Sequence, residues 1–518
     1  MRFIPYFRQV FFLGAILYVG FVANAKSSRI DQLLATDNAK ANAKAEGGPT
    51  KAAQKIGDLE FLRKTSIDLI GRIPTYEEIG QYQKWPASQR RAKLLDKLVS
   101  DPRFADRWTV YFADMLRIRS AATGGNALLA YLHKAIEENR PWDDLAREMI
   151  SANGSTGKTP AVGFILGEEA EPMALAAATA QMFLGVQMFC AQCHNHPFDR
   201  WTQDDYYSFA SFFTQVGRKR AADPRESIIY NRRSGETNHP VHKKPMPPKF
   251  LGGDAPEIKS GQDRRVILSE WIASPENPFF ARNLANLVWA HFFCQGIIEP
   301  VDDVRITNPA SNPELLDELA KRFTEYNYDF KKLVRDVCNS RIYQLSSQPN
   351  ETNADDTRNF ARSHLRRMRA EILLDAISQV TNTKNKFQGL PLGARAVQIA
   401  DGRVSNYFLT TFGRATRETV CSCEVKMEPN LSQALHLLNG EVANRRITQG
   451  NLVKKMIDEG KPPENILDDL YVRCLSRKPR EPERANLLAA VNGDENKQAA
   501  LEDAFWALLN SKEFIFNH

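Results

Sequence analysis

The sequence predicts a mainly α-helical protein in which two helical domains are joined by an irregular segment. Apolar residues recur at spacings of three and four through most of the chain, which is the period of an amphipathic helix. Sustained alternation with β-branched residues, the mark of strands, is scarce. Residues 217–261 break the helical pattern and are basic and rich in Pro and Gly. We expect them to form a linker or an irregular lobe.

Helix starts can be located along the first half, over residues 57–216. Thr75 and Glu78 have the spacing of a capping box, and Pro102 is placed to open a helix. Pro172 opens an Ala-rich helix that is expected to run into Cys190. The preceding residues, 26–56, are rich in Ala, Lys and Asn, and predict a flexible or partly helical lead-in.

The second half, residues 262–518, resumes the helical pattern. Asn312 and Pro313 are a cap residue and a first-turn proline. Cys294, Cys338 and Cys474 stand alone among apolar residues and are interpreted as buried, inert thiols.

The N-terminus has the features of a secretory signal over residues 1–25. Arg2 and Arg8 form a basic region, an apolar run follows, and Ala23-Asn24-Ala25 matches a cleavage site. The run is short for a membrane span, although an uncleaved anchor is the alternative. We therefore expect an exported protein, periplasmic or extracellular, with no membrane span after cleavage.

The charge balance excludes little but argues against nucleic-acid binding. The formal net charge is +7, and residues 1–25 contribute two Arg and no acid, which leaves +5. No basic stripe is interleaved with aromatic residues. The charge itself identifies no partner; a redox partner or a cell-envelope protein is expected on the grounds of the motif at residues 190–194.

The most informative motif is C-x-x-C-H at residues 190–194. This pattern is the attachment signature of c-type haem, in which both thiols bind the porphyrin and the histidine ligates iron. Cys190, Cys193 and His194 are therefore the predicted cofactor-binding residues, and haem c is the predicted cofactor. Met246 lies in a Met-Pro loop and is the candidate distal ligand, with His196, His239 and His242 as alternatives.

Two other interpretations of the same residues stay open. Cys190 and Cys193 could form a disulfide in an oxidising compartment. They could also hold zinc or another metal ion together with Cys421 and Cys423 of a C-x-C pair, with His194 or His196 as further ligands. The protein would then be a scaffold or binding module for cell-surface or polysaccharide-processing partners.

Weaker signals point to other sites. Arg282, Asn286 and Trp289 share one side of a predicted helix and could form a ligand-binding face. Asp302 and Asp303 form a carboxylate pair further along the chain. A hydrolase built around His194 or His196 and Asp199 is supported only by their proximity in sequence.

The run CAQCHNHPFDRWTQDDYYSFASFF, residues 190–213, resembles the hallmark of the planctomycete cytochrome-like domain, and residues 61–79 resemble its start. The second half resembles its usual companion, a planctomycete-specific domain, in residues 274–293, 299–320, 417–424, 433–440 and 503–518. The resemblance implies an exported protein and, by the family's name, haem, while leaving the activity open. Family loops similar to that of Met246 often carry other apolar residues, and the C-x-C pair belongs to the family pattern.

Overall fold

The computed structural model describes residues 28–42, 50–356, 359–400, 402, 405–419, 425–439 and 441–518. Over these residues the protein is mainly helical with a few short strands, which confirms the predicted fold class. The predicted signal at residues 1–25 and the pair Cys421 and Cys423 lie outside the described residues. No helix in the described ranges is long and apolar enough to cross a membrane.

The first half forms ten helices and two irregular helical turns in the described chain. They are α1 (Arg29–Asn42), α2 (Asp58–Ile70), α3 (Tyr76–Gln83), α4 (Arg90–Val99), α5 (Pro102–Met115), α6 (Gly125–Glu137), α7 (Trp142–Ser151), α8 (Val162–Gly167), α9 (Pro172–Thr179), the π-helical turn η1 (Ala180–Leu184), the 3-10 turn η2 (Phe189–Gln192) and α10 (Gln203–Ala210). The Thr75 side chain caps α3 by accepting from the Glu78 amide, as its spacing predicts. Residues 29–42 of the expected lead-in are helical, and Ile30 and Leu34 of α1 are buried in a core.

The segment 217–261 is mostly irregular but includes part of a small antiparallel sheet. The strands are β1 (Gly154–Ser155), β2 (Val216–Arg220) and β3 (Ser227–Asn231), in the order β1-β3-β2. Arg218 pairs with Ile229, whose side chain is buried. The sequence did not predict this hairpin because a five-residue strand is too short to give a clear alternating pattern.

The second half adds thirteen α-helices and two 3-10 turns in the described chain. They are α11 (Arg264–Ile272), α12 (Phe280–Phe293), α13 (Pro313–Glu325), α14 (Phe330–Asn339), η3 (Ile342–Gln344), α15 (Ala370–Val380), η4 (Ala396–Gln398), α16 (Tyr407–Thr411), α17 (Leu431–Asn439), α18 (Glu441–Gly450), α19 (Leu452–Asp458), α20 (Pro463–Leu475), α21 (Glu481–Gly493), α22 (Lys497–Leu509) and α23 (Lys512–Ile515), with η3 and η4 as 3-10 turns. Strand β4 (Arg366–Arg367) pairs antiparallel with β5 (Phe516–Asn517).

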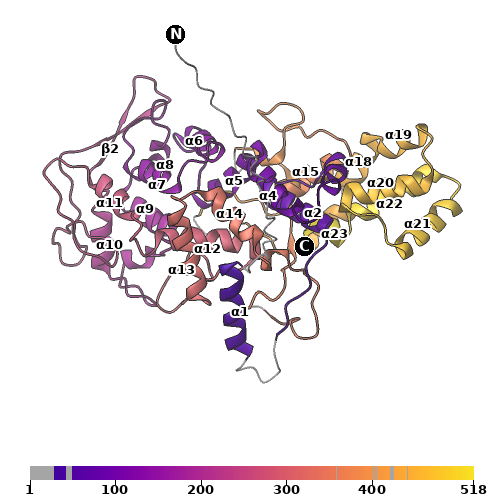
Figure 1. The fold of residues 1–518 in the computed structure, drawn as a ribbon. Coiled ribbons are helices and arrows are strands. Elements are labelled where there is room, and N and C mark those ends of the chain that lie inside the picture. The colour runs from indigo at the N-terminus through magenta and orange to yellow at the C-terminus, as the bar shows by residue number, and fades with distance from the viewer. Residues whose placement is uncertain are drawn as a thin grey trace, which may run out of the picture.

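The apolar interior is divided into two clusters, and the division does not follow the two halves. One cluster runs from Ile30 to Phe360 and includes side chains of α11 to α14 as well as the first half. The other consists of residues 368–515 together with Ile67, Ile73 and Val110 of the first half. Figure 1 shows the result: α19 to α22 lie at one end of the molecule and α10, α11 and β2 at the other.

The irregular segment lies against the first cluster, since Ile229 and Leu251 are part of it. The packing therefore changes from one cluster to the other after residue 360 and not at residues 217–261. The sequence boundaries at 57–216, 217–261 and 262–518 stay predictions, because a sequence unit and a packing unit need not coincide.

The two clusters are joined by buried ion pairs. Asp68 of α2 accepts hydrogen bonds from Arg366 of β4, from Asn517 of β5 at 2.7 Å and from the Tyr343 hydroxyl at 2.8 Å. Asp114 of α5 is the second joining residue. Its carboxylate pairs with the guanidinium groups of Arg369 and Arg417, the latter at 2.8 Å.

We expect Asp114→Asn to destabilise the protein by about 3 kcal/mol or more, because removing one partner leaves buried guanidinium charge uncompensated. The measurement is the urea midpoint at neutral pH. Asp317→Asn is the matched control, since Asp317 pairs with Arg282 at 2.6 Å where both side chains are well exposed. Its cost should stay below about 1 kcal/mol, and equal costs for the two variants would contradict the role given to the junction.

The buried ion pairs at the junction of the two clusters also include Glu371, which pairs with Arg369 at 3.0 Å. This junction predicts that the fold is sensitive to acid. Burial alone would raise the pKa of Glu371, but Arg369 and Arg414 outweigh it and lower the pKa to about 2. A carboxylate with a lowered pKa stabilises the fold above its ordinary pKa of about 4.5 and loses that contribution as the pH falls toward 2. As the pH is lowered from about 4.5 to about 2, the urea midpoint should fall steeply for the native protein and less steeply for Glu371→Gln.

Candidate functional site

The helix that precedes the C-x-x-C-H motif ends before reaching it. Helix α9 continues through the π-helical turn η1 and ends at Gly185, whose φ of 70° is left-handed. A β-carbon at Gly185 would lie 2.7 Å from Oδ1 of Asn283, so glycine suits this close approach as well as the turn. The expected run of helix into Cys190 was therefore wrong, and the motif begins on the separate turn η2.

One short turn gathers the three residues of the motif. The amides of Cys193 and His194 both donate to the carbonyl of Cys190, at 3.3 and 3.4 Å. Cys190, Cys193 and His194 are all exposed to solvent. Neither thiol is part of a disulfide. Two reduced, accessible thiols therefore stand beside an accessible imidazole.

The ring of His194 is held in one orientation. Its Nδ1 lies 2.8 Å from the carbonyl oxygen of Asn195, which can only accept a hydrogen bond. Nδ1 must therefore carry a proton, and in the neutral ring this leaves the lone pair on Nε2. Metal-binding histidines commonly have this arrangement, in which a backbone carbonyl fixes the tautomer and the other nitrogen is the ligand.

The loop after the motif is anchored on α10. Gln203, at the start of α10, donates from its amide to Oδ1 of Asn195 and from its side chain to the carbonyl of Gln192, each at 3.0 Å. The Tyr207 hydroxyl donates to the same Gln192 carbonyl at 3.3 Å. These bonds fix the motif on the protein surface through its backbone, leaving its thiols and imidazole unobstructed.

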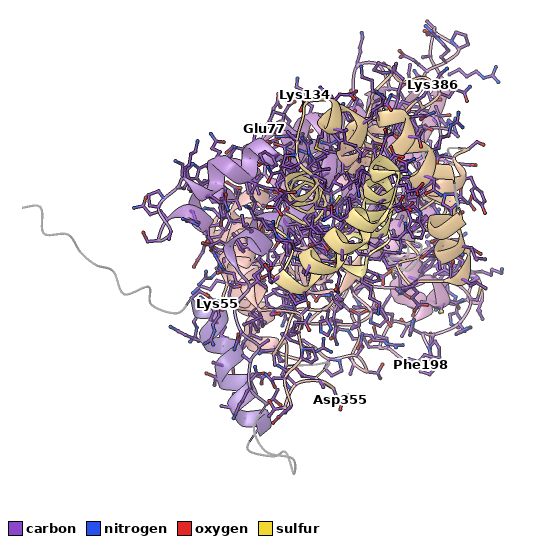
Figure 2. The ribbon with its side chains drawn as sticks, turned by 90° about the vertical axis from the view of Figure 1, so that its right-hand side faces the viewer. Lys55, Glu77, Lys134, Phe198, Asp355 and Lys386 are labelled. Carbon is purple, nitrogen blue, oxygen red and sulfur yellow. The ribbon has the colours of Figure 1, made fainter. Side chains whose placement is uncertain are left out.

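Large apolar side chains surround the motif without being covered. Phe189 is 71 % exposed, Phe198 is 62 % exposed and Ile306 is 67 % exposed. The last two lie on neighbouring loops, since the Thr307 hydroxyl donates to the carbonyl of Phe198 at 2.9 Å. Figure 2 shows Phe198 at the outer edge of the molecule. Such a group of exposed apolar side chains marks a surface that another group or molecule covers.

The residues named as distal ligands occupy defined loops. Met246 is half-buried, and its backbone binds Thr237 and the Ser211 hydroxyl at the far end of α10 from Gln203. Nδ1 of His239 accepts the amides of Val241 and His242, and its ring stacks on that of His242 at 4.5 Å. The ligation of iron by Met246 stays a prediction.

His196 has a local structural role. Its Nδ1 accepts the amide of Phe198 at 3.2 Å, and its own amide donates to the carbonyl of Trp201 at 2.8 Å. The described residues contain no group of three or more His, Cys, Asp or Glu that could hold a metal ion. The four-thiolate site with Cys421 and Cys423 stays a prediction, because both residues lie outside the described ranges.

A second candidate site lies where the two core clusters meet, and the sequence did not predict it. It is a cavity of about 520 Å³, a size typical of small-molecule sites. Its wall includes Asp68, Arg107, His291, Arg366 and Asn517, which come from five segments far apart in the chain.

Helix α12 turns a different face to the cavity from the one that its sequence indicated. The residues of α12 that line the cavity are Asn283, Leu287, Ala290 and His291, together with Cys294 at its C-cap. Of the three predicted, Arg282 pairs with Asp317 at the surface, and Asn286 binds the backbone of Ile298 in the interior. Trp289 is buried. Cys338 and Cys474 are buried as expected. Cys294 is exposed and borders the cavity, so its expected burial was wrong.

Two family models match the chain in succession. Residues 29–218 match PSCyt2, a protein of unknown function (DUF1549), and residues 264–491 match PSD1, a protein of unknown function (DUF1553). No curated protein and no solved structure matches the chain.

The exposure of the thiols predicts their reactivity. In reduced protein without attached haem, iodoacetamide should label Cys190 and Cys193 within the time in which Cys338 and Cys474 stay unlabelled. The latter two are fully buried, and burial raises the pKa of each thiol and so suppresses its thiolate. Peptide mass spectrometry at successive times measures this, and equal labelling of all four would contradict the placement of the motif.

Proposed function

Because the chain belongs to the family in which a planctomycete cytochrome-like domain is followed by its planctomycete-specific companion, we propose that it is an exported redox protein with one c-type haem. Cys190 and Cys193 would hold the porphyrin through thioether bonds, and Nε2 of His194 would ligate the iron. The observation that carries the proposal is the shared surface turn, on which two reduced thiols and a correctly oriented imidazole are accessible together.

The residues present fit haem in their donor chemistry. Thioether formation requires free thiols, and both thiols of the motif are free and exposed. Proximal ligation requires an unprotonated imidazole nitrogen, which the bond from His194 to Asn195 leaves at Nε2. The exposed rings of Phe189 and Phe198 offer apolar contact beside the thiols. When bound, the haem would accept and release one electron at a time.

The position of the motif favours electron exchange with another protein over chemistry on an enclosed substrate. Cys190, Cys193 and His194 are all at the surface, so a redox partner could approach this face. The export predicted from residues 1–25 would place this exchange outside the cytoplasm. The partner would be a redox protein or another protein of the cell envelope.

The test is an absorption spectrum of protein exported by a host that matures c-type cytochromes, followed by a haem stain after denaturing electrophoresis. We expect a Soret band and a stain that stays with the chain. Cys193→Ser should remove the stain, because one thioether bond and the attachment signature are lost. Cys474→Ala is the control, since it removes a thiol that is buried away from the motif.

A colourless protein would contradict the proposal. Metal analysis of the same sample would then separate the two alternatives: bound zinc that is lost in Cys190→Ser and in Cys421→Ser would favour the thiolate scaffold. A metal-free protein with Cys190 and Cys193 linked would favour the disulfide.

A further variant tests the distal ligand. If Met246 ligates the iron, Met246→Leu should keep the covalently attached haem, because both thioether bonds remain. It should also change the visible spectrum of the oxidised protein and speed the binding of added cyanide. An unchanged spectrum would assign the distal position to another residue.

A further inference from the structure

The cavity between the two core clusters contains a buried cation without a partner. Arg107 of α5 is 3 % exposed, and its Nε and Nη1 make no hydrogen bond within the described chain. The arginines around it are all engaged. Arg366 binds Asp68, and Arg369 binds Asp114 and Glu371.

An unpaired buried guanidinium is costly, and burial lowers the pKa of Arg107 only to about 10, so it remains charged at neutral pH. Its stem packs against Gly71 at the end of α2, where a β-carbon would approach Cδ of Arg107 to 3.0 Å. The side chain is therefore fixed with its donors at the cavity wall. Pre-oriented, unsatisfied donors of this kind are what an anion site requires.

The remaining wall combines apolar side chains with charged groups, which are Asp68, Asp114, Glu299, Asp302, Glu428, Arg366, Arg367 and Arg369. Met115, Met182, Leu287 and Ile372 contribute apolar surface. His291 also borders the cavity with an unpartnered Nε2, and burial together with Arg107 and Arg369 lowers its pKa well below the ordinary value, so it is neutral. Leu365 is exposed and lines the cavity, which places an opening to solvent at that side.

We propose that this cavity binds a small organic monocarboxylate, with its carboxylate on Arg107 and its body against the apolar wall. The planar fork of arginine donates two parallel hydrogen bonds to a carboxylate. A single negative charge matches the single unpaired cation. A phosphate dianion is disfavoured, because Glu299, Asp302 and Glu428 also line the space and repel a double charge more strongly than a single one.

This site is independent of the proposed haem, because its residues lie at the junction of the clusters and include none of the C-x-x-C-H motif. Of the elements that carry the motif, only the π-helical turn η1, which precedes it, reaches the cavity, through Gln181 and Met182. Failure of the haem test would leave this proposal standing, and the reverse also holds.

The experiment is thermal unfolding of the full exported chain with benzoate, hexanoate, methyl benzoate or phenyl phosphate at equal concentrations. Benzoate and hexanoate should raise the midpoint in proportion to the logarithm of their concentration. Methyl benzoate, which is uncharged, and phenyl phosphate should have little effect. No stabilisation by either carboxylate, or a larger effect of phenyl phosphate, would overturn the proposal.

The decisive variant is Arg107→Met, which keeps the volume of the stem and removes the charge. It should abolish the effect of benzoate, because the donors that hold the carboxylate are lost. An equal effect of benzoate on the variant and the native protein would overturn the assignment of Arg107.

A second readout does not depend on the folding of that variant. Cys294 lines the cavity, and burial raises the pKa of its thiol to about 11, so alkylation by iodoacetamide at pH 9 should be slow but measurable. In protein without attached haem, benzoate in the cavity should slow the labelling of Cys294 several-fold and leave that of Cys190 unchanged. Equal rates with and without benzoate would contradict binding in the cavity.

Discussion

The structure depends on buried carboxylates of the first half that are neutralised by arginines of the second half. Asp68 and Asp114 project from α2 and α5, and their partners Arg366, Arg369 and Arg417 lie around β4 and in the chain after η4. None of these charges would be tolerated alone in an interior. Because each needs a partner from the other half, the two parts of the chain specify each other's position.

The same ion pairs explain why the molecule has both two cores and a cavity between them. Apolar side chains collapse into contact, whereas paired charged groups keep fixed lengths and directions and cannot close over every space. The junction is lined with such groups, and within the described residues Nε and Nη1 of Arg107 make no hydrogen bond. A site for a ligand is therefore a consequence of joining the clusters through charge instead of through apolar contact.

Features that depend on a few adjacent residues could be predicted from the sequence. The capping box of Thr75 and Glu78, the helix start at Asn312 and the thiols of the C-x-x-C-H turn are examples. Each depends on residues that are adjacent in sequence, so it can be identified without knowledge of the rest of the fold. The mainly helical class followed from the same local periodicity.

The cavity could not be predicted in this way. Arg107 lies on an ordinary amphipathic helix beside Trp108, and nothing near it in sequence reveals that it will have no partner. Its neighbours in space include Arg366 and Asn517, which come hundreds of positions later in the chain. The α12 face was misassigned for a similar reason, because helical periodicity groups side chains without saying which group meets an open space.

The pairing of β5 with β4 and of Asn517 with Asp68 also has a consequence for the order of assembly. Figure 1 shows the C-terminus in the middle of the molecule, near α2, and not at its outer end. A chain that crosses a membrane from its N-terminus would deliver the C-x-x-C-H turn long before residue 517 follows. If the chain is exported and carries haem as proposed, the turn would be available for haem attachment while the junction is still open, and residues 516 and 517 would close the junction afterwards.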